Sequence, residues 1–152
     1  AAKAGIGFTL HPYEVEYGSA DADSYGEAVA AALGVPPERL FKTLLAEVDG
    51  RLTVGVVPVS GRLDLKALAA AVGGKRARMA APADAERATG YVVGGISPLG
   101  QRKRLPTVVD DSALNFETIY FSAGKRGLQI ETAPATLIEL TGAVTAPIGK
   151  RT

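Results

Sequence analysis

Residues 41–59 read FKTLLAEVDGRLTVGVVPV, two apolar runs that are joined by Asp49-Gly50. Aspartate followed by glycine between two apolar runs is the strongest short-range signal for a β-hairpin, because both residues tolerate the positive φ angles of a tight turn. The sequence therefore predicts one strand over 41–48 and a second over 52–59. Pro58 has no amide N–H to donate, which indicates a strand end or an edge strand at that point.

The segments on both sides of the hairpin predict a mixture of helices and strands. Ser24 and Glu27 have the spacing of a capping box before an apolar helical stripe that Gly34 ends. Asp64 is the expected N-cap of the next helix, and Gly73 is its expected C-cap. Further helices are expected over 81–90 and 133–142, and further strands over 7–13, 76–79, 105–110, 118–124 and 128–133. Because strands and helices do not alternate regularly, we expect an α+β fold with a largely antiparallel or mixed sheet, in a single domain over 1–152.

Composition excludes several classes of catalytic site. The chain of 152 residues is 47% hydrophobic, enough for one sizeable core, and it has no cysteine and one histidine, His11. The lack of cysteine excludes a disulfide framework, a thiolate zinc site and a cysteine nucleophile, and it fits a reducing cytoplasm. No acidic cluster has the spacing of a metal site, no cofactor motif is recognised, and a lone histidine on a strand is more often structural than catalytic. We therefore expect neither a metal nor a cofactor.

No feature of the sequence indicates a membrane. No apolar run approaches the roughly 20 residues that span a bilayer, and the first residues lack the layout of a signal peptide. We expect a soluble, cytoplasmic protein. The chain does not begin with methionine, so we also expect that some native N-terminal residues are missing.

Charge is distributed unevenly along the chain, although the net charge at pH 7 is only +1. Residues 1–50 carry three Lys or Arg against eight Asp or Glu, a net charge of −5, whereas residues 51–152 carry fourteen against eight, a net charge of +6. The basic residues cluster at 75–78, 102–104 and 125–126. Such clusters either bind phosphates by displacing condensed counterions or belong to an ordinary solvated surface, and clusters this short do not decide between the two.

Lys42 is the unusual residue of the first hairpin strand. Period-two alternation directs Lys42 to the same face as the apolar Leu44, and directs Thr43 to the other face. A lysine held on an apolar face can donate hydrogen bonds to a carbonyl or phosphate group. The alternative is that its ammonium reaches water near the start of the strand, and spacing alone favours that alternative.

The segment GGISPLG at 94–100 is a flexible loop with a fixed proline. Its spacing is wrong for a dinucleotide-binding fingerprint, and the Gly-Lys-Ser/Thr of a phosphate-binding P-loop is missing. Glycines let a ligand approach the backbone closely, and successive N–H groups in such a turn can bind an anion or polarise a carbonyl. A tight turn with a glycine bulge explains the pattern equally well. The short GKRG at 124–127 is likewise either a plain hairpin loop or a phosphate contact.

Six segments, in their order along the chain, resemble the YbaK/EbsC family of free-standing aminoacyl-tRNA deacylases. They are LHPYE at 10–14, YGEAVAAALG at 25–34, FKTLL at 41–45, LDLKALAAAVG at 63–73, ATGYVVGGISPLGQRKRLPTVVD at 88–110 and IYFSAGKRGLQIE at 119–131. The resemblance runs from about residue 8 to residue 138, and FKTLL and GGISPLG together are highly specific. It implies an α+β fold with a mixed, mostly antiparallel, barrel-like sheet and surrounding helices, related to the editing domain of bacterial prolyl-tRNA synthetases. It also implies a pocket for the aminoacylated 3′ end of tRNA.

The resemblance further implies which residues form that pocket. Lys42 takes the place of the family's essential lysine, and the loop at 94–100 matches a loop whose backbone lies against the substrate. The candidate catalytic residues are therefore Lys42, Gly94, Gly95, Ser97 and Gly100; the candidate substrate-binding residues are Tyr13, Tyr25, Thr43, Ile96, Pro98 and Leu99; and the candidate tRNA-phosphate contacts are Arg102, Lys103, Arg104, Lys125 and Arg126. Two positions depart from the pattern, because Gln129 stands where some relatives carry Asp and Tyr25 where some carry Phe. We assign no catalytic role to Gln129.

The mechanism that the resemblance implies uses the substrate's own sulfur. The thiolate of a bound cysteinyl group attacks its ester carbonyl, releases the tRNA and leaves a thiolactone that opens in water. The protein then has to hold a near-attack geometry and stabilise the oxyanion, tasks that need no protein nucleophile and no cofactor. Alanine and proline lack a thiol, so their esters would be spared. We expect trans-editing of Cys-tRNA(Pro), with Cys-tRNA(Cys) left open, in a transient complex with prolyl-tRNA synthetase.

Two other functions remain open from the sequence. An Ala-tRNA(Pro) deacylase would share the fold, the lysine and the glycine loop but would activate water in place of a substrate thiol. A non-catalytic module that binds tRNA or a synthetase would use the basic clusters alone and would bind in a salt-dependent manner without deacylation.

Overall fold

The predicted hairpin forms the centre of the main sheet. The structure, a computed structural model, describes residues 8–14, 22–89, 98, 105–124 and 127–151. Strands β2 (Phe41–Val48) and β3 (Arg51–Pro58) pair antiparallel, from Phe41 opposite Pro58 to Val48 opposite Arg51. Asp49 and Gly50 form the turn with φ angles of 50° and 84°, as their sequence predicts. Pro58 is the last residue of β3, which confirms a strand end.

Five strands make up this sheet, in the order β5-β2-β3-β6-β9. The added strands are β5 (Ala77–Met79), β6 (Thr107–Asp110) and β9 (Val144–Ala146). β2 is antiparallel to β3 and β5, whereas β6 is parallel to both of its neighbours. The expectation of a mixed sheet is therefore confirmed. Short β9 was not expected, because three residues carry too little periodicity to identify a strand.

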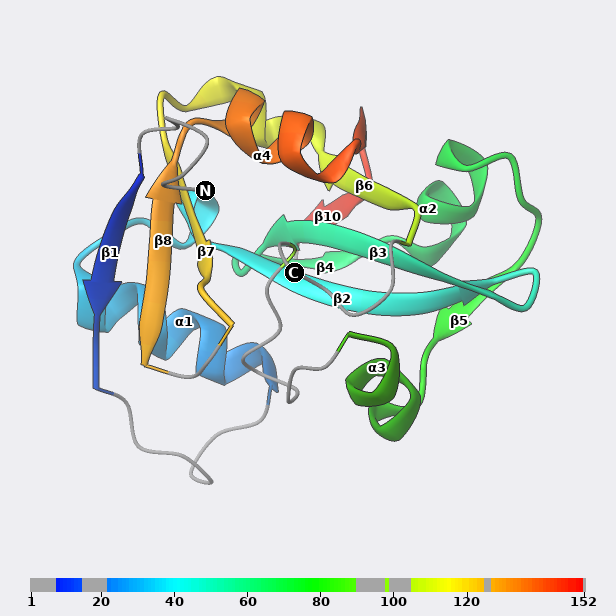
Figure 1. The fold of residues 1–152 in the computed structure, drawn as a ribbon, viewed down its shortest axis with the longest axis horizontal. Helices are drawn as coiled ribbons and strands as arrows, with labels where there is room; N and C mark the ends of the chain where they lie inside the picture. Colours follow the sequence, from blue (N-terminus) through cyan, green and yellow to red (C-terminus); the bar gives the residue numbers. More distant parts are fainter. Residues whose placement is uncertain (1–7, 15–21, 90–97, 99–104, 125–126, 152) are drawn as a thin grey trace.

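A second sheet of three antiparallel strands stands beside the first at the start of β2 (Figure 1). It consists of β1 (Thr9–Pro12), β8 (Leu128–Thr132) and β7 (Ile119–Ser122), in the order β1-β8-β7. An isolated parallel bridge between Leu40 and Tyr120 joins the two sheets. β4 (Gly61–Leu63) and β10 (Gly149–Arg151) form a separate pair. The α+β class is confirmed, although the described strands form these three sheets and do not close into a barrel.

The helices lie where the sequence predicts them, with corrections at two helix ends. They are α1 (Ala22–Leu33), α2 (Leu65–Ala71), α3 (Pro82–Thr89) and α4 (Pro134–Thr141), with short 3-10 turns η2 (Pro37–Arg39) and η3 (Asp111–Asn115). The Asp64 side chain accepts a hydrogen bond from the Ala67 amide at 3.1 Å, which confirms it as the N-cap of α2. The prediction for α1 was wrong by one turn, because the helix begins at Ala22 and Ser24 lies inside it. The C-cap of α2 is Val72 and not Gly73, which follows it with a φ angle of 74°. No helix in the described part of the chain is long and apolar enough to cross a membrane.

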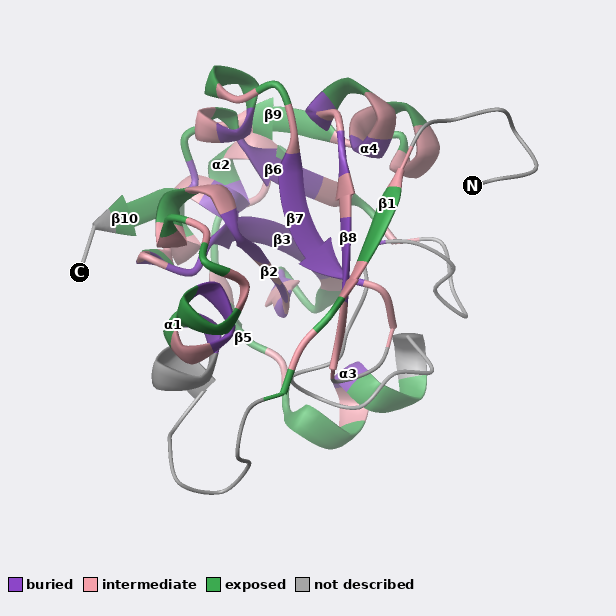
Figure 2. Cartoon of the chain, turned by 90° about the vertical axis from the view of Figure 1, so that its left-hand side faces the viewer, coloured by how far each residue is buried: buried purple, intermediate pink, exposed green. Residues whose placement is uncertain are grey.

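The buried core runs through the strands on both sides of β2 (Figure 2). One face of β2 packs Phe41 and Leu45 against Val54, Phe121 and other apolar residues. The other face contributes Ala46 and Val48 to a cluster that includes Leu68 of α2. A third cluster joins α1 to Leu40 and Tyr120 where the two sheets meet. The junction of the two sheets is thus packed from several sides, and Lys42 lies two residues from the bridge that forms it.

Candidate active site

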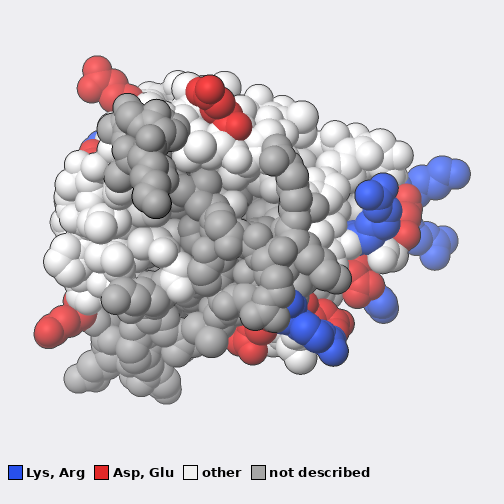
Figure 3. Space-filling model, viewed as in Figure 1, with Lys and Arg blue, Asp and Glu red and all other residues white. Residues whose placement is uncertain are grey.

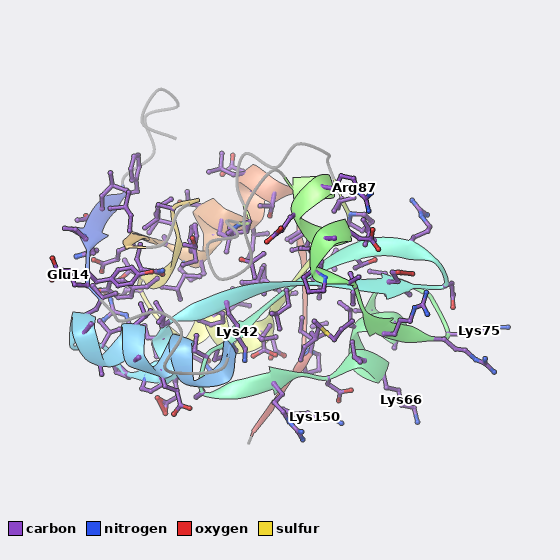
Figure 4. The ribbon with its side chains drawn as sticks, turned by 90° about the horizontal axis from the view of Figure 1, so that it is seen from below. Glu14, Lys42, Lys66, Lys75, Arg87 and Lys150 are labelled. Carbon is purple, nitrogen blue, oxygen red and sulfur yellow. The ribbon has the colours of Figure 1, made fainter. Side chains whose placement is uncertain are left out.

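Lys42 lies on β2 on the face that the alternation predicts. Leu44, Ala46 and Val48 of the same face pack into one apolar cluster, and Lys42 stands opposite Val57, which belongs to that cluster. The Lys42 side chain is half-buried. Figure 4 shows it near the middle of the molecule, whereas Lys66 and Lys75 project outward from the end opposite to Glu14. Lys42 is therefore a partly desolvated cation in the interior part of the sheet.

The bridge between the sheets aligns Lys42 with polar residues of β7 and β8. Leu40 and Tyr120 are paired in parallel and pack in one cluster, so they share a face. Two residues further on each strand, Lys42 and Ser122 are directed to that same face. Ser122 pairs with Gln129, and Gln129 pairs with His11 of β1. Ser122, Gln129 and His11 thus lie side by side on β7, β8 and β1. Together with Lys42, which alternation directs to the same face from β2, we call them the polar row.

Gln129 has a buried oxygen without a hydrogen-bond partner. The residue is 5% exposed and Ser122 is 8% exposed. Ser122 Oγ accepts a hydrogen bond from the Gly124 amide at 3.2 Å, whereas Gln129 Oε1 has no partner among the described residues. Leaving a buried acceptor unsatisfied costs about 1–3 kcal/mol. A ligand that donates a hydrogen bond at this position would remove that cost, so Gln129 is a candidate binding residue.

Ser122 and Gln129 were not expected as site residues from the sequence. Alternation within IYFS at 119–122 and LQIE at 128–131 would have placed Ser122 and Gln129 each on a defined face of its strand. Alternation does not say which strands lie side by side, and the link to Lys42 depends on the contact between β2 and β7.

Thr43 and Lys42 point to opposite faces of β2. Thr43 is 8% exposed and lies between Phe41 and Leu45, which face the large apolar cluster. Its hydroxyl oxygen is buried and has no hydrogen-bond partner in the described part of the chain. The structure therefore does not bring Thr43 to the polar row, and its role as a substrate-binding residue remains a prediction.

Tyr13 lies at the end of β1 beside the polar row. Its amide donates a hydrogen bond to the Gly127 carbonyl at 3.0 Å, and its half-buried side chain packs against the cluster that contains Tyr120. Helix α1 covers the same cluster with Val29 and Ala30. A Cβ at Gly26 would approach Val59 Cγ1 to 2.7 Å, so the lack of a side chain lets α1 pack closely. Tyr25 belongs to this helix, and its side chain lies outside the described atoms.

Of the remaining candidate residues, the structure describes Pro98 alone, which is buried. The other members of the predicted loop and of the two basic clusters lie outside the described residues: Gly94, Gly95, Ile96, Ser97, Leu99, Gly100, Arg102, Lys103, Arg104, Lys125 and Arg126. Their roles in catalysis, substrate binding and phosphate contact stay predictions.

A second polar group, centred on Glu131, lies on the same face of β8, two residues from Gln129. Glu131 accepts hydrogen bonds from His11 Nε2 at 2.8 Å, from Arg39 Nη2 at 3.1 Å and from the Thr118 hydroxyl at 2.5 Å. Arg39 also donates from Nε to the Thr118 carbonyl at 2.8 Å. We call Glu131, His11, Arg39 and Thr118 the Glu131 network. It ties β1, β8 and the segments before β2 and β7 together.

Hydrogen bonding sets the ionisation of this network. The pKa of Glu131 lies below its usual value, chiefly because of the hydrogen bond from Thr118. Burial acts in the opposite direction, and the hydrogen bond from His11 lowers the pKa further. The pKa of Tyr120 is raised, first by burial and then by the negative charge of Glu131. The Arg39 guanidinium lies over the Tyr120 ring, 5.1 Å from its centroid. His11 is thus hydrogen-bonded to a carboxylate that other residues of the fold also contact, which agrees with a structural role. Among the described residues, no group of three His, Cys, Asp or Glu side chains could hold a metal ion.

Comparison with known proteins identifies the family of this site. Residues 19–140 match the model of the aminoacyl-tRNA editing domain. The chain is 42% identical over 141 residues to an Enterococcus faecalis protein with the provisional name Cys-tRNA(Pro)/Cys-tRNA(Cys) deacylase EbsC, covering 90% of this chain and 85% of the relative. It is 32% identical over 103 residues to the Escherichia coli multifunctional Ser/Thr-tRNA deacylase ProXp-y, covering 64% of this chain and 62% of the relative.

A solved structure shows the same fold. A protein described as a candidate trans-editing enzyme for prolyl tRNA synthetase superimposes with a TM-score of 0.79, at 24% identity over 94% of this chain and 87% of the other. This likeness concerns the fold, and the family match extends over most of the chain. The chain belongs to the aminoacyl-tRNA editing domain family, and it is an enzyme of the aminoacyl-tRNA deacylase class.

Proposed function

We propose that the protein is a trans-editing deacylase that removes cysteine from mischarged Cys-tRNA(Pro), with Cys-tRNA(Cys) as a further substrate. The observation that carries this proposal is the 42% identity, over 90% of the chain, to the Enterococcus relative whose name gives these two substrates. The polar row supports it, because it combines a partly desolvated cation with a buried acceptor that has no partner in the described structure. A short aminoacyl ester offers both an oxygen for the cation and an ammonium group for the acceptor.

In the proposed reaction the substrate supplies the nucleophile. The cysteinyl thiolate attacks its own ester carbonyl, the carbon–sulfur bond forms, and the bond to the ribose 3′ oxygen breaks. That oxygen leaves as the tRNA hydroxyl after taking up the proton that the thiol lost, and water then opens the thiolactone to free cysteine. The protein contributes positioning and electrostatic stabilisation. Lys42 holds the 3′-terminal nucleotide and stabilises developing negative charge, Gln129 Oε1 accepts a hydrogen bond from the ammonium group, and amides of the loop at 94–100 contact the carbonyl.

A second candidate function uses water in place of the thiol. It is favoured by the similarity to the Escherichia coli relative named as a Ser/Thr-tRNA deacylase, because serine and threonine esters carry no thiol. An Ala-tRNA(Pro) deacylase would belong to the same mechanistic class. In either case the encounter with tRNA(Pro) would take place in a transient complex with prolyl-tRNA synthetase, the enzyme that mischarges it.

A panel of charged tRNAs separates the two candidates. The wild-type protein is offered Cys-, Ser-, Thr- and Ala-tRNA(Pro), together with tRNA(Pro) carrying S-methylcysteine, which keeps the sulfur but carries a methyl group on it and cannot form the thiolactone. We expect release of cysteine alone. Efficient hydrolysis of the S-methylcysteinyl or alanyl ester would exclude the thiol-assisted reaction and establish activated water. Release of no amino acid would exclude the proposed substrates altogether.

A further inference from the structure

A basic surface lies at the end of β2 that is far from Lys42. It consists of Arg51, Lys75, Arg76 and Arg78, all exposed, which we call the hairpin-tip cluster. Arg51 begins β3, and the other three belong to β5 or precede it. Figure 3 shows Lys and Arg side chains gathered over this end of the molecule. The reaction proposed above assigns no role to these residues.

The backbone of this cluster is held firmly to the hairpin turn. Both carboxylate oxygens of Asp49 accept backbone hydrogen bonds at 3.0 Å, one from Lys75 and one from Arg76. The Asp49 amide in turn donates to the Arg76 carbonyl at 2.9 Å. The two hydrogen bonds to the Asp49 carboxylate lower the pKa of Asp49 and keep it charged, and the one from Arg76 has the larger effect. The Lys75 and Arg76 side chains are therefore displayed from a fixed loop.

The cluster keeps an excess of positive charge. Four basic side chains stand against Glu47 and Asp49, which leaves a net charge of +2. Glu47 pairs with Arg78 at 3.1 Å, and Asp49 is occupied by backbone amides. In the described part of the chain, Lys75 and Arg76 form no ion pair with an acidic side chain. Amino and guanidinium groups presented in this way bind phosphate oxygens, the guanidinium with two parallel hydrogen bonds.

The position of the cluster fits an extended polyanion that starts at Lys42. Val48, at the hairpin end of β2, lies six residues beyond Lys42, which corresponds to about 20 Å along a strand. Glu14 marks the other end of the molecule, opposite to Lys75 (Figure 4), and its carboxylate carries the charge opposite to that of the hairpin tip. A polyanion bound at Lys42 is therefore attracted toward the hairpin tip and repelled from the Glu14 end.

We propose that the hairpin-tip cluster binds backbone phosphates in the acceptor arm of the tRNA whose 3′ end is held at Lys42; this inference rests on the proposed deacylase function. Double-stranded RNA is recognised mainly through its shape, its phosphates and its 2′-hydroxyl groups, so this surface adds affinity without reading bases. It would orient the arm along β2 and deliver the aminoacyl end to the polar row.

The test measures the activity of the double variant Lys75→Ala/Arg76→Ala on two substrates, one long and one short. The variant keeps both backbone amides that donate to Asp49. We expect kcat/KM for Cys-tRNA(Pro) to fall about tenfold and kcat/KM for a cysteinyl CCA trinucleotide to stay unchanged. Binding of uncharged tRNA(Pro) should weaken, and the slope of log affinity against log salt should become shallower by about 2. The control is Arg62→Ala/Lys150→Ala, an exposed pair of cross-strand neighbours on β4 and β10 that removes the same charge.

The outcomes are distinguishable from failure of the proposed function. If the wild type releases no cysteine from either substrate, the proposed function fails, and the binding and salt measurements still test the cluster. If Lys75→Ala/Arg76→Ala binds tRNA(Pro) as the wild type does, or if the Arg62→Ala/Lys150→Ala control loses as much affinity, the inference is overturned. A loss seen only when prolyl-tRNA synthetase is added would overturn it as well and assign the surface to a protein partner.

Discussion

Gln129 and Glu131 lie two residues apart on the same face of β8, yet their surroundings are opposite. Glu131 is partly exposed and accepts hydrogen bonds from three side chains, which come from β1, from η2 and from the residue before β7. Gln129 is more deeply buried, and its Oε1 has no partner among the described residues. Both side-chain oxygens of Glu131 accept hydrogen bonds within the fold, whereas the one side-chain oxygen of Gln129 accepts none from the described residues.

Within one short strand, Glu131 contributes to stability, whereas Gln129 is a candidate for function. Charge-assisted hydrogen bonds contribute about twice as much as neutral ones, so the Glu131 network stabilises the junction of β1, β7 and β8. An unsatisfied amide oxygen has the opposite effect on the free energy of unfolding. The proposed reaction assigns this oxygen to the ammonium group of the substrate, on the face to which Lys42 and Ser122 are also directed.

The largest expected effect is that of Lys42→Ala on catalysis. Removing one donor that stabilises a developing oxyanion lowers kcat by about 10²–10³-fold, and we expect a fall of this size in kcat/KM for Cys-tRNA(Pro). The unfolding midpoint in urea should change little, since the ammonium is only half-buried. Lys66→Ala on the exposed face of α2 is the matched control and should keep full activity. Unchanged release of cysteine by Lys42→Ala would remove this lysine from the reaction.

The second effect concerns stability. Glu131→Gln removes the charge that Arg39 and His11 face, and we expect the free energy of unfolding at pH 7 to fall by about 1–3 kcal/mol. Activity of the folded variant should stay within about threefold, because Glu131 contacts the polar row only through His11, to which the proposed reaction assigns no role. The measurement is a pair of urea titrations. A variant as stable as the wild type would show that the network contributes nothing net.

The pH dependence sharpens this prediction. The folded-state pKa of Glu131 is lowered, so its stabilising contribution is fully present above the ordinary glutamate pKa of about 4.3 and is lost as the pH falls through the folded value. The difference in unfolding free energy between wild type and Glu131→Gln should therefore persist down to the ordinary glutamate pKa and should shrink as the pH falls further. A difference that grows below the ordinary glutamate pKa would have the wrong sign.

The smallest effect on stability is expected at Gln129. Gln129→Leu replaces the unpartnered amide with an apolar group of similar size, and replacements of this kind are nearly neutral or stabilising. We expect kcat/KM for Cys-tRNA(Pro) to fall about tenfold, because the bound ammonium group loses its acceptor. Gln129→Glu should restore an acceptor and recover part of the activity. Full activity in Gln129→Leu would show that the substrate does not use this oxygen.

Local sequence signals predict where the helices and strands of this fold form. They do not predict which of these elements lie side by side. Asp49-Gly50 predicts the hairpin, and Asp64 and Gly142 mark helix ends, because turn and cap chemistry depends on adjacent residues. The parallel pairing of β3 with β6 and the bridge from Leu40 to Tyr120 join segments about 50 and 80 residues apart. No local pattern encodes those contacts. Lys42 could be singled out from alternation and motif, whereas Ser122 and Gln129 became candidates only once β7 was placed beside β2.

The most direct test measures stability and activity together on Gln129→Leu and Glu131→Gln. The free energy of unfolding and kcat/KM for Cys-tRNA(Pro) are determined for both variants and the wild type at pH 7. We expect a crossover, in which Gln129→Leu keeps its stability and loses about tenfold in kcat/KM, while Glu131→Gln loses about 1–3 kcal/mol of stability and keeps its activity. Parallel losses of both quantities in both variants would contradict the separation of a binding acceptor from a structural one.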